Sequence, residues 1–424
     1  MVAGISRRGR RRASFEGRNG RPVSAVCSAL GALVVFSAGL APSASAADVQ
    51  AQQWYLSAMK AGEMWKVSTG KGIKVAVIDT GVNPDTSSLK GQVLANEVPK
   101  AVGYKATEDY LGHGTSMAEI IAGTGAGGGL KGLAPGAKIV PYRIALKGLK
   151  SEVEEKKAPL AAAVIRAVAG SDAKIINMSF GIDVNDPVME AAIKYAQSKG
   201  KLMIAGTGND AGQKNFIGYP AAYPYVVGVA AADKSGKVGK FSEHGNYVDL
   251  AAPGLDMPTW CDATFSSYCD GVGTSMATAI TSASAALIWS AHPKWTANQV
   301  LASLIDTAGR DWAKDNPSTY LGYGLIRPRL VLEKGDFNPG PANTDPLAKE
   351  NAAGVTGETS NSPSASASTS PQPSKGTSTG ETSAAASTSD TSDNFTMWVA
   401  LGAAAAVLVI GGSAFAVIRS RRGA

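Results

Sequence analysis

Cysteine is scarce in this sequence, which has three cysteines among 424 residues. Cys27 lies in an N-terminal segment that we expect to be removed, so only Cys261 and Cys269 remain in the mature chain. No third or fourth ligand lies near this pair at a usable spacing, which argues against a zinc site. We therefore predict a Cys261–Cys269 disulfide, the usual state of paired cysteines in exported proteins.

The sequence also lacks a recognisable metal or cofactor motif. Asp183, Asn185 and Asp186 are the nearest approach to a calcium-binding cluster, but a loop followed by a helix cap explains them more simply. We expect no metal ion and no cofactor.

Charged residues are unevenly placed, so the formal net charge of +7 does not describe the body of the chain. Residues 1–47 contain seven arginines and one glutamate, and residues 419–424 contain three arginines. The residues between these two segments therefore have a formal net charge of −2. This balance excludes the broad basic surface that nucleic-acid binding needs, and we expect no nucleic-acid partner.

The two ends of the chain predict export and membrane insertion. Residues 1–47 combine an arginine-rich start, an apolar run and a small-residue cleavage site, as in a secretory signal peptide. The pair Arg11-Arg12 leaves both the Sec and the twin-arginine export routes open. Residues 395–418 are uncharged and mostly apolar, and at about 1.5 Å per residue they can cross a hydrocarbon core of about 30 Å.

The arginines of residues 419–424 predict the orientation of this single span. By the positive-inside rule they form a cytoplasmic tail, which places everything before the span outside the membrane. Residues 336–394 are rich in Ser, Thr, Ala, Pro and Gly, so we expect them to form a disordered linker. A folded domain is then left to residues 48–335, with a short N-terminal extension.

Within this domain, short unbroken apolar runs alternate with helical patterns. The apolar runs are Lys74–Ile78, Ile139–Ile144, Lys174–Met178, Lys201–Ala205 and Tyr225–Ala230, with Tyr247–Ala251 as an edge strand. The helical patterns begin at Thr115 and Thr274 and cover Pro159–Ala169, Asp186–Lys199 and Thr296–Ala308. Strands that are apolar on both faces are typical of a parallel sheet covered by helices, so we predict an α/β layered domain.

Three segments together predict nucleophilic catalysis. Ser275 follows Gly271-Val272-Gly273-Thr274 at the start of a long small-residue helix, where backbone N–H groups can face an oxygen that becomes negative. Asp79 ends the first apolar run, and His113 lies in Gly112-His113-Gly114-Thr115 ahead of another helix. An alcohol, an imidazole base and an orienting carboxylate are the parts of an acyl-transfer triad.

Position in the chain decides between competing residues for two of these roles. His244 lies in a polar loop and His292 ends a helix, so neither needs a catalytic explanation. Ser116 belongs to a copy of the nucleophile's own pentapeptide, Gly-Thr-Ser-Met-Ala. It would share a helix with His113 and leave little room for a substrate carbonyl between them, so we assign the nucleophile to Ser275.

These segments, in the order Asp, His, Ser, resemble those of subtilisin-like (S8 family) serine proteases. The likeness covers residues 53–330 and implies a subtilisin-like three-layer fold with a mainly parallel central sheet, joined here to one C-terminal transmembrane helix. The segment from Gln53 to Gly72, with Trp54 and Trp65, resembles the mycosins, which are membrane-anchored subtilases that accompany type VII secretion systems.

The resemblance also implies further site residues. Asn209, in Gly206-Thr207-Gly208-Asn209-Asp210, resembles the oxyanion-hole asparagine of subtilases, which acts beside the backbone N–H of the nucleophile. Ser179, Phe180 and Gly181 resemble the family's substrate-binding strand, where an extended peptide pairs by main-chain hydrogen bonds. Ile182 stands where many relatives have glycine, which predicts a narrower pocket for the residue before the cut.

The function that follows is a membrane-anchored, extracytoplasmic serine endopeptidase of the cell membrane. We expect protein or peptide substrates among exported or envelope proteins, a Gram-positive bacterial envelope, and a type VII secretion membrane complex as partner. The alternative is a structural component of such a complex, for which catalysis is incidental. A wall-processing sugar hydrolase is disfavoured because no carboxylate pair of that kind is recognisable.

Overall fold

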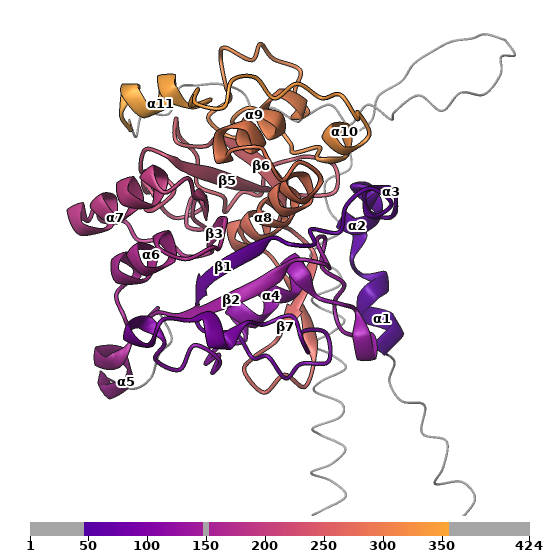
Figure 1. Ribbon diagram of the computed structural model, residues 1–424, viewed down its shortest axis with the longest axis vertical. Helices are drawn as coiled ribbons and strands as arrows, with labels where there is room; N and C mark the ends of the chain where they lie inside the picture. Colours follow the sequence, from indigo (N-terminus) through magenta and orange to yellow (C-terminus); the bar gives the residue numbers. More distant parts are fainter. Residues whose placement is uncertain (1–45, 147–151, 356–424) are drawn as a thin grey trace, which may run out of the picture. The chain divides into compact units, whose positions relative to one another are not determined.

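The structure, a computed structural model, describes residues 46–146 and 152–355, and its centre is a parallel β-sheet (Figure 1). Six strands hydrogen-bond in the order β2-β1-β3-β4-β5-β6, and every pair is parallel. The strands are β1 (Lys74–Asp79), β2 (Lys138–Arg143), β3 (Ile175–Met178), β4 (Leu202–Gly206), β5 (Val226–Ala232) and β6 (Leu250–Pro253). Five lie where the apolar runs predicted them, and the edge strand β6 begins three residues later than the predicted Tyr247–Ala251.

Alternate residues of each strand enter two different cores, which explains why the runs are apolar throughout. Val75 and Val77 of β1 belong to the larger core, whereas Ala76 and Ile78 belong to the smaller one. Since successive side chains point to opposite faces of a sheet, both faces of this sheet are covered.

Helices from different parts of the chain cover the two faces. On the face of the smaller core lie α6 (Ala161–Ala169) and α7 (Pro187–Ser198), at the left in Figure 1. The opposite face is covered by α4 (His113–Ala122), α8 (Thr274–Ala291) and α9 (Ala297–Thr307). The result is the predicted α/β arrangement of a mainly parallel sheet between helical layers.

Helix α8 is buried over nearly its whole length, although it contains many hydroxyl groups. Thr278, Thr281 and Ser284 each donate a hydrogen bond of 2.8 Å to the carbonyl four residues earlier, so their burial leaves no unpaired donor. Small side chains let this helix approach the strands closely. A Cβ placed on Gly206, at the end of β4, would lie 2.7 Å from Thr274 Oγ1.

A two-stranded antiparallel hairpin, which we did not predict, lies just before α8. It consists of β7 (Met257–Trp260) and β8 (Tyr268–Gly271). The predicted disulfide joins Cys261, directly after β7, to Cys269 in β8. The hairpin packs on α4: the Tyr268 hydroxyl donates to Glu119 Oε2 at 2.9 Å. The disulfide prediction is confirmed.

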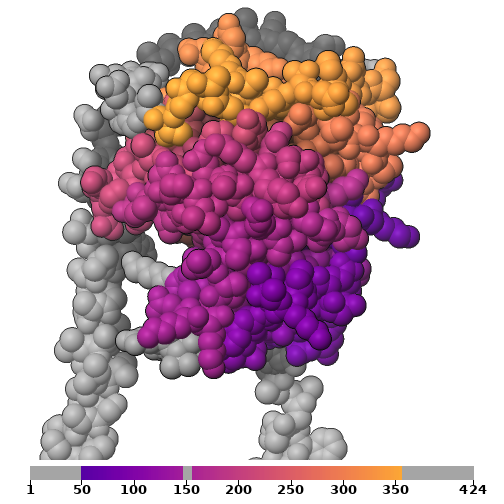
Figure 2. All heavy atoms as spheres, turned by 60° about the vertical axis from the view of Figure 1, so that its left-hand side comes forward, coloured from indigo at the N-terminus to yellow at the C-terminus, as the bar shows by residue number. Residues whose placement is uncertain are grey.

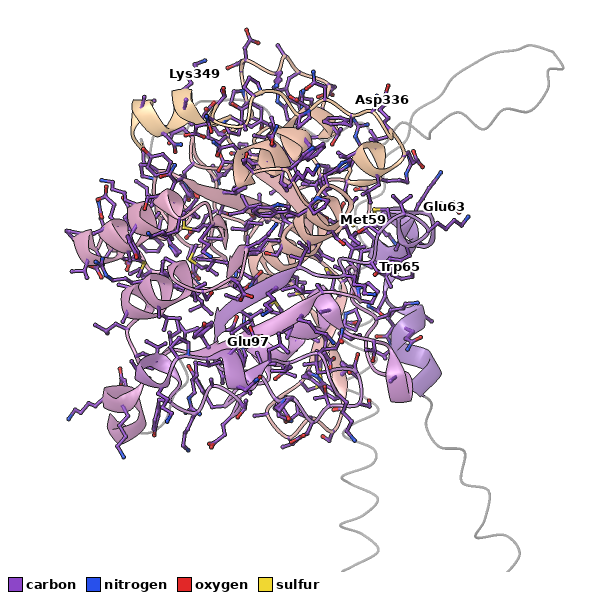
Figure 3. All side chains as sticks on the ribbon, viewed as in Figure 1. Met59, Glu63, Trp65, Glu97, Asp336 and Lys349 are labelled. Carbon is purple, nitrogen blue, oxygen red and sulfur yellow. A yellow bond between two sulfur atoms is a disulfide. The ribbon has the colours of Figure 1, made fainter. Side chains whose placement is uncertain are left out.

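The N-terminal extension forms three short helices that pack on the domain at the right in Figures 1 and 3. They are α1 (Ala46–Ala51), α2 (Trp54–Ala58) and α3 (Ala61–Trp65). Trp54 Nε1 donates to the Leu255 carbonyl at 3.0 Å, and Trp65 Nε1 donates to the Leu133 carbonyl at 2.8 Å. Both tryptophans of the mycosin-like segment therefore fix this extension to the domain.

The folded part of the chain extends beyond residue 335, where we expected the disordered linker to begin. After α10 (Arg329–Leu332), the chain continues to α11 (Ala348–Ala353) along the top of the domain (Figure 2). Leu347 is 2% exposed within the larger core, and the Tyr225 N–H donates to Asn351 Oδ1 at 3.0 Å. Phe337 packs on the larger core and Val355 on the smaller one, so a few apolar and polar contacts hold a segment whose composition predicted disorder.

The signal peptide (1–47) lies almost entirely outside the described residues. The part of the linker after residue 355, the transmembrane helix (395–418) and the basic tail (419–424) lie wholly outside them. No helix in the described ranges is both long and apolar enough to span a membrane.

Candidate active site

The predicted site residues gather at the carboxyl edge of the sheet, where the strand order reverses. Strand β1 pairs with β2 on one side and with β3 on the other, and the crevice beyond such a reversal is where α/β sheets bind ligands. A cleft of about 410 Å³ opens there. It is lined by Ser179, Phe180 and Gly181 after β3, by Asn209 after β4 and by Ser275 in the first turn of α8.

His113 and Asp79 are in direct contact at this edge. His113 Nδ1 lies 2.7 Å from Asp79 Oδ1, and the Asp79 side chain is fully buried. Glycine at position 114 makes this approach possible, because a Cβ there would lie 2.1 Å from the Gly81 carbonyl oxygen and 3.0 Å from Asp79 Cβ. The Gly-His-Gly sequence therefore places the first turn of α4 against the end of β1.

A second buried carboxylate, Asp109, supports this contact and was not identified from the sequence. Its Oδ1 accepts the Thr80 hydroxyl at 2.7 Å, and its Oδ2 accepts both the N–H and the hydroxyl of Thr115. Thr80 in turn donates its N–H to Asp79 Oδ1 at 2.8 Å. Asp109 therefore links the segment after β1 to the start of α4.

The protonation of His113 is governed by these carboxylates. Burial alone would lower the pKa of the imidazole, but the charge and hydrogen bond of Asp79 outweigh burial, and Asp109 adds a smaller effect. The pKa of His113 is therefore raised above its ordinary value of 6.5. An imidazole with a raised pKa is a stronger proton acceptor once it is neutral.

Ser275 occupies the first turn of α8, next to the strand segment after β3. Its Oγ donates to the Ser179 carbonyl at 3.2 Å, and Ser179 Oγ donates back to the Ser275 carbonyl at 3.1 Å. Among the described residues, no hydrogen bond joins Ser275 Oγ to the His113 ring. Catalytic hydrogen bonds in free enzymes are often long and tighten only with substrate, so this geometry is compatible with a triad.

Ser116, the competing serine, is fully engaged in holding the local structure. It is buried, its hydroxyl donates to the Gly112 carbonyl at 2.7 Å, and it accepts the Trp260 N–H at 2.9 Å. Ser116 therefore connects α4 to the β7–β8 hairpin, and its hydroxyl proton is already donated to the Gly112 carbonyl.

Asn209 lies beside the nucleophile, with its two amide atoms in different surroundings. Its Oδ1 accepts the Thr274 N–H at 2.9 Å and the Thr274 hydroxyl at 3.1 Å. Its Nδ2 has no hydrogen-bond partner within the described part of the chain and is left to donate into the cleft. The oxygen therefore orients the side chain, and the nitrogen stays available to an oxyanion.

The segment Ser179–Gly181 presents an unpaired backbone edge to the cleft. Phe180 is mostly buried in the smaller core, which anchors the segment. In the resolved ranges, the peptide groups of Phe180 and Gly181 form no backbone hydrogen bond, whereas those of Ile182 pair with Tyr219 at 2.8 Å in both directions. A short extended peptide could pair with this free edge.

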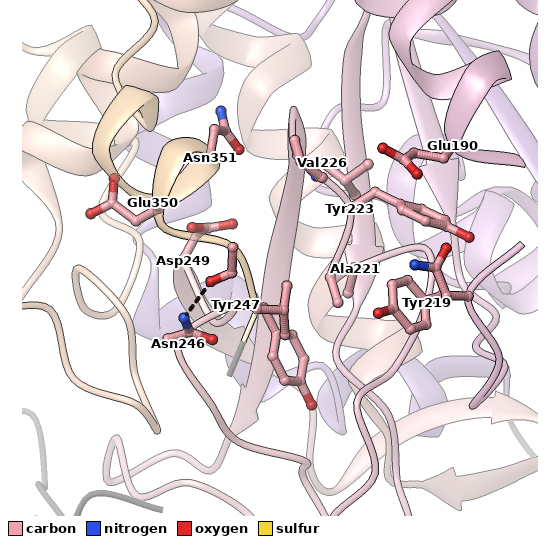
Figure 4. Close-up of a pocket in the computed structure, with 15 residues that line it drawn as sticks. Glu190, Tyr219, Ala221, Tyr223, Val226, Asn246, Tyr247, Asp249, Glu350 and Asn351 are labelled. Atoms are coloured by element: carbon pink, nitrogen blue, oxygen red, sulfur yellow. Dashed lines mark hydrogen bonds between the residues drawn. The ribbon is translucent and has the colours of Figure 1, made fainter. Parts of the chain in front are cut away.

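A second cavity of about 280 Å³ is lined by Tyr219, Tyr223 and Tyr247, among others (Figure 4). Asp249 and Glu350 line it, and burial raises the pKa of Asp249 well above its usual range. None of the residues predicted for catalysis lines this cavity. The described residues contain no group of three or more His, Cys, Asp or Glu side chains that could hold a metal ion.

Sequence comparisons identify relatives of this chain. A model of the subtilase family matches residues 70–324. Subtilisin E of Bacillus subtilis (strain 168) is 33% identical over 268 residues, which cover 62% of this chain and 67% of that protein. The minor extracellular protease Epr of the same bacterium is 33% identical over 285 residues, 65% of this chain, and the chain spans only 41% of its length.

Solved structures give the same assignment of the fold. The MycP3 protease from the type VII (ESX-3) secretion system matches with a TM-score of 0.55 and 28% identity, over 69% of this chain and 90% of that one. MycP1 with its N-terminal propeptide removed matches with a TM-score of 0.55 and 26% identity, over 68% of this chain and 99% of that one. The chain belongs to the subtilase family of serine endopeptidases, and mycosins are among its structural neighbours.

Proposed function

We propose that this protein is a membrane-anchored, extracytoplasmic serine endopeptidase of mycosin type, with Asp79, His113 and Ser275 as its catalytic triad. The observation that carries the proposal is the 2.7 Å contact between His113 Nδ1 and the buried Asp79 carboxylate, at the sheet edge where Ser275 lies in the first turn of α8. A carboxylate on Nδ1 leaves Nε2 as the basic nitrogen that can face a serine hydroxyl.

Each residue would have a distinct task in peptide hydrolysis. Ser275 Oγ turns from the Ser179 carbonyl to His113, loses its proton to the imidazole and attacks the scissile carbonyl. Asp79 keeps the imidazole oriented and stabilises its cationic form. The developing oxyanion is met by Asn209 Nδ2 and the Ser275 N–H, which begins α8 and so carries the positive end of the helix dipole.

The substrate would lie as an extended strand along Ser179–Gly181. The free peptide groups of Phe180 and Gly181 support main-chain pairing, which recognises a backbone whatever its side chains. Ser179 lies between this edge and the nucleophile, since it exchanges hydrogen bonds with Ser275. A peptide bound there would have its scissile carbonyl beside Ser275.

Location and partners are proposed from the ends of the sequence and from the relatives. The signal peptide and the 395–418 span would place the protease domain outside the cell membrane of a Gram-positive bacterium, on a linker that crosses part of the wall. MycP3 belongs to a type VII secretion system, which supports a type VII membrane complex as partner. Exported or envelope proteins would then be the substrates.

Covalent labelling tests the catalytic part of this proposal. We expect a serine-directed phosphonate to modify the full-length, detergent-purified protein at Ser275, as mapped by peptide mass. Ser275→Ala should abolish labelling and lower kcat at least about 10⁴-fold. Ser116→Ala is the matched control, because it changes the same pentapeptide and should label like the wild type. Labelling at Ser116, or none in a folded wild-type protein, would contradict the proposal.

A structural role in the secretion complex is the second candidate, and the mycosin neighbours favour it. A Ser275→Ala strain separates the two roles, because it keeps the fold and removes the nucleophile. If catalysis is the essential role, this strain should secrete as poorly as a strain that lacks the whole gene. Normal secretion by the Ser275→Ala strain alone would assign the essential role to the scaffold.

A further inference from the structure

The cleft beside Ser275 contains a buried carboxylate that the triad does not use. Glu243 lies in the loop before β6, is 3% exposed and lines the same cleft as Ser275 and Asn209. No side chain in the described ranges pairs with its carboxylate. Burying a carboxylate without a cation is costly, so its position beside a substrate cleft calls for an explanation.

Two glycines bring this carboxylate to the wall of the cleft. A Cβ on Gly208 would lie 1.8 Å from Glu243 Oε2, and a Cβ on Gly218 would lie 3.1 Å from it. Both glycines line the cleft themselves. Any larger residue at position 208 would displace the carboxylate, so the local sequence is fitted to hold a glutamate at this depth.

The charge of the cleft is of one sign. Its lining residues include Asp183, Asp210 and Glu243, and no lysine, arginine or histidine is among them. Burial raises the pKa of Glu243 to about 7, hydrogen bonds from the backbone of Phe216 and Asp210 oppose the rise, and the charges of Asp210 and Asp183 add to it. A cation bound in the cleft would favour the ionised carboxylate.

The same cleft has apolar lining residues beside this carboxylate. Ile182 and Phe216 line it together with the glycines, and Ile182 is partly exposed. A lysine or arginine side chain can lay its methylene groups against such surface while its charged end reaches deeper. A short or acidic side chain would leave the carboxylate unpaired.

We propose that Glu243 is a specificity-determining residue, which selects substrates with lysine or arginine immediately before the scissile bond. This inference rests on the proposed serine endopeptidase function, because that function makes the cleft next to Ser275 and Asn209 the site for the side chain beside the scissile carbonyl. The basic end group pairs with the Glu243 carboxylate at the base of the cleft. Asp183 and Asp210 add attraction around it.

The test is a set of peptides that differ only in the residue before the cut: Lys, Arg, Gln or Leu. The full-length protein in detergent should cleave the Lys and Arg peptides with a kcat/KM about 10- to 100-fold above that for Gln, which is of similar length but uncharged. Glu243→Gln, nearly isosteric, should lower kcat/KM for Lys and Arg by a similar factor. The Gln and Leu peptides should change less than about threefold.

Two controls separate this inference from the proposed function. Asp336→Asn removes an exposed carboxylate at the periphery of the domain (Figure 3) and should leave the preference unchanged. Phosphonate labelling of Ser275 counts active sites in each preparation. Equal cleavage of all four peptides by labelled enzyme would overturn the role of Glu243 and leave the endopeptidase standing. Absence of both labelling and cleavage would overturn both.

Cleavage of the four peptides by the wild-type protein tests the role of Glu243 even if Glu243→Gln does not fold. A preference for Leu or Gln over Lys and Arg in the unmodified protein is by itself incompatible with a cation-selecting carboxylate. A preference for Lys and Arg that survives Glu243→Gln would assign the selection to Asp183 and Asp210 and overturn the role of Glu243.

Discussion

At the residue scale, the site depends on where single carboxylates are buried. Asp79 has one oxygen on His113 and on the Thr80 N–H, whereas its Oδ2 is buried without a hydrogen-bond partner in the described structure. A buried carboxylate with so few donors is stabilised chiefly by the cationic form of its histidine. In the proposed triad, Asp79 would stabilise the imidazolium that forms during proton transfer.

Replacing Asp79 tests this role through pH. Because only neutral His113 can accept a proton, its raised pKa predicts that kcat/KM falls on the acid side from a pH above 6.5. Asp79→Asn removes the charge that raises this pKa and leaves burial, which lowers it. We expect the acid limb of the kcat/KM–pH profile to move to lower pH than in the wild type. We also expect kcat to fall about 10⁴-fold.

Asp85→Asn is the control for this change, since it alters an exposed carboxylate six residues further along the chain. It should leave both the acid limb and kcat as in the wild type. An acid limb that stays in place in Asp79→Asn, measured with a peptide of constant charge, would show that another group titrates.

The residues that could be predicted from the sequence are those marked by a pattern in the residues next to them along the chain. Asp79 ends an apolar run, His113 lies between two glycines at a helix start, and Ser275 follows Gly273 and Thr274 at the start of another helix, so local patterns single out these three residues. Asp109 and Glu243 have no such pattern. Their importance comes from burial beside segments about 30 residues away in the chain, such as Thr80 and Gly208, which only the fold brings together.

At the element scale, the β7–β8 hairpin forms the outer support of α4. Its Trp260 N–H and Tyr268 hydroxyl bind Ser116 and Glu119 on that helix. We did not predict the hairpin because its strands have four residues each and little apolar alternation. The six sheet strands were found because continuous apolar runs have a stronger signal. Helix α11 was missed because only a few scattered apolar residues, such as Leu347, anchor its segment.

Removing the Cys261–Cys269 bridge tests what the hairpin contributes. The bridge closes a loop of about eight residues, so its loss should lower the free energy of unfolding by about 2.5 kcal/mol through the entropy of the unfolded chain. We expect a lower urea midpoint for the Cys261→Ser/Cys269→Ser double variant. Reductant should lower the midpoint of the wild type and leave that of the double variant unchanged. Equal midpoints for oxidised and reduced wild type would contradict this expectation.

At the scale of the whole molecule, one topological feature brings the distant segments together. The sheet order reverses around β1, so the ends of β1, β3 and β4 meet at one edge, and α8 begins beside them. The parallel strands were enough to predict that the segments after β1, β3 and β4 lie at one edge of the sheet. The depth and charge of the cleft were not, because they depend on which side chains of the loops turn inward.

The proposed attachment of this domain to the membrane can be tested by deletions in the full chain. Residues 395–418 carry no charge, and arginines follow at once, so deleting residues 395–424 should move the protein from the membrane pellet to the soluble fraction. Deleting residues 360–389 removes the same length of chain from the linker and should leave the protein in the pellet. Both variants should keep kcat/KM within about twofold of the full chain, because neither deletion reaches the described domain. A 395–424 deletion that still sediments after an alkaline carbonate wash would show that another segment holds the protein to the membrane.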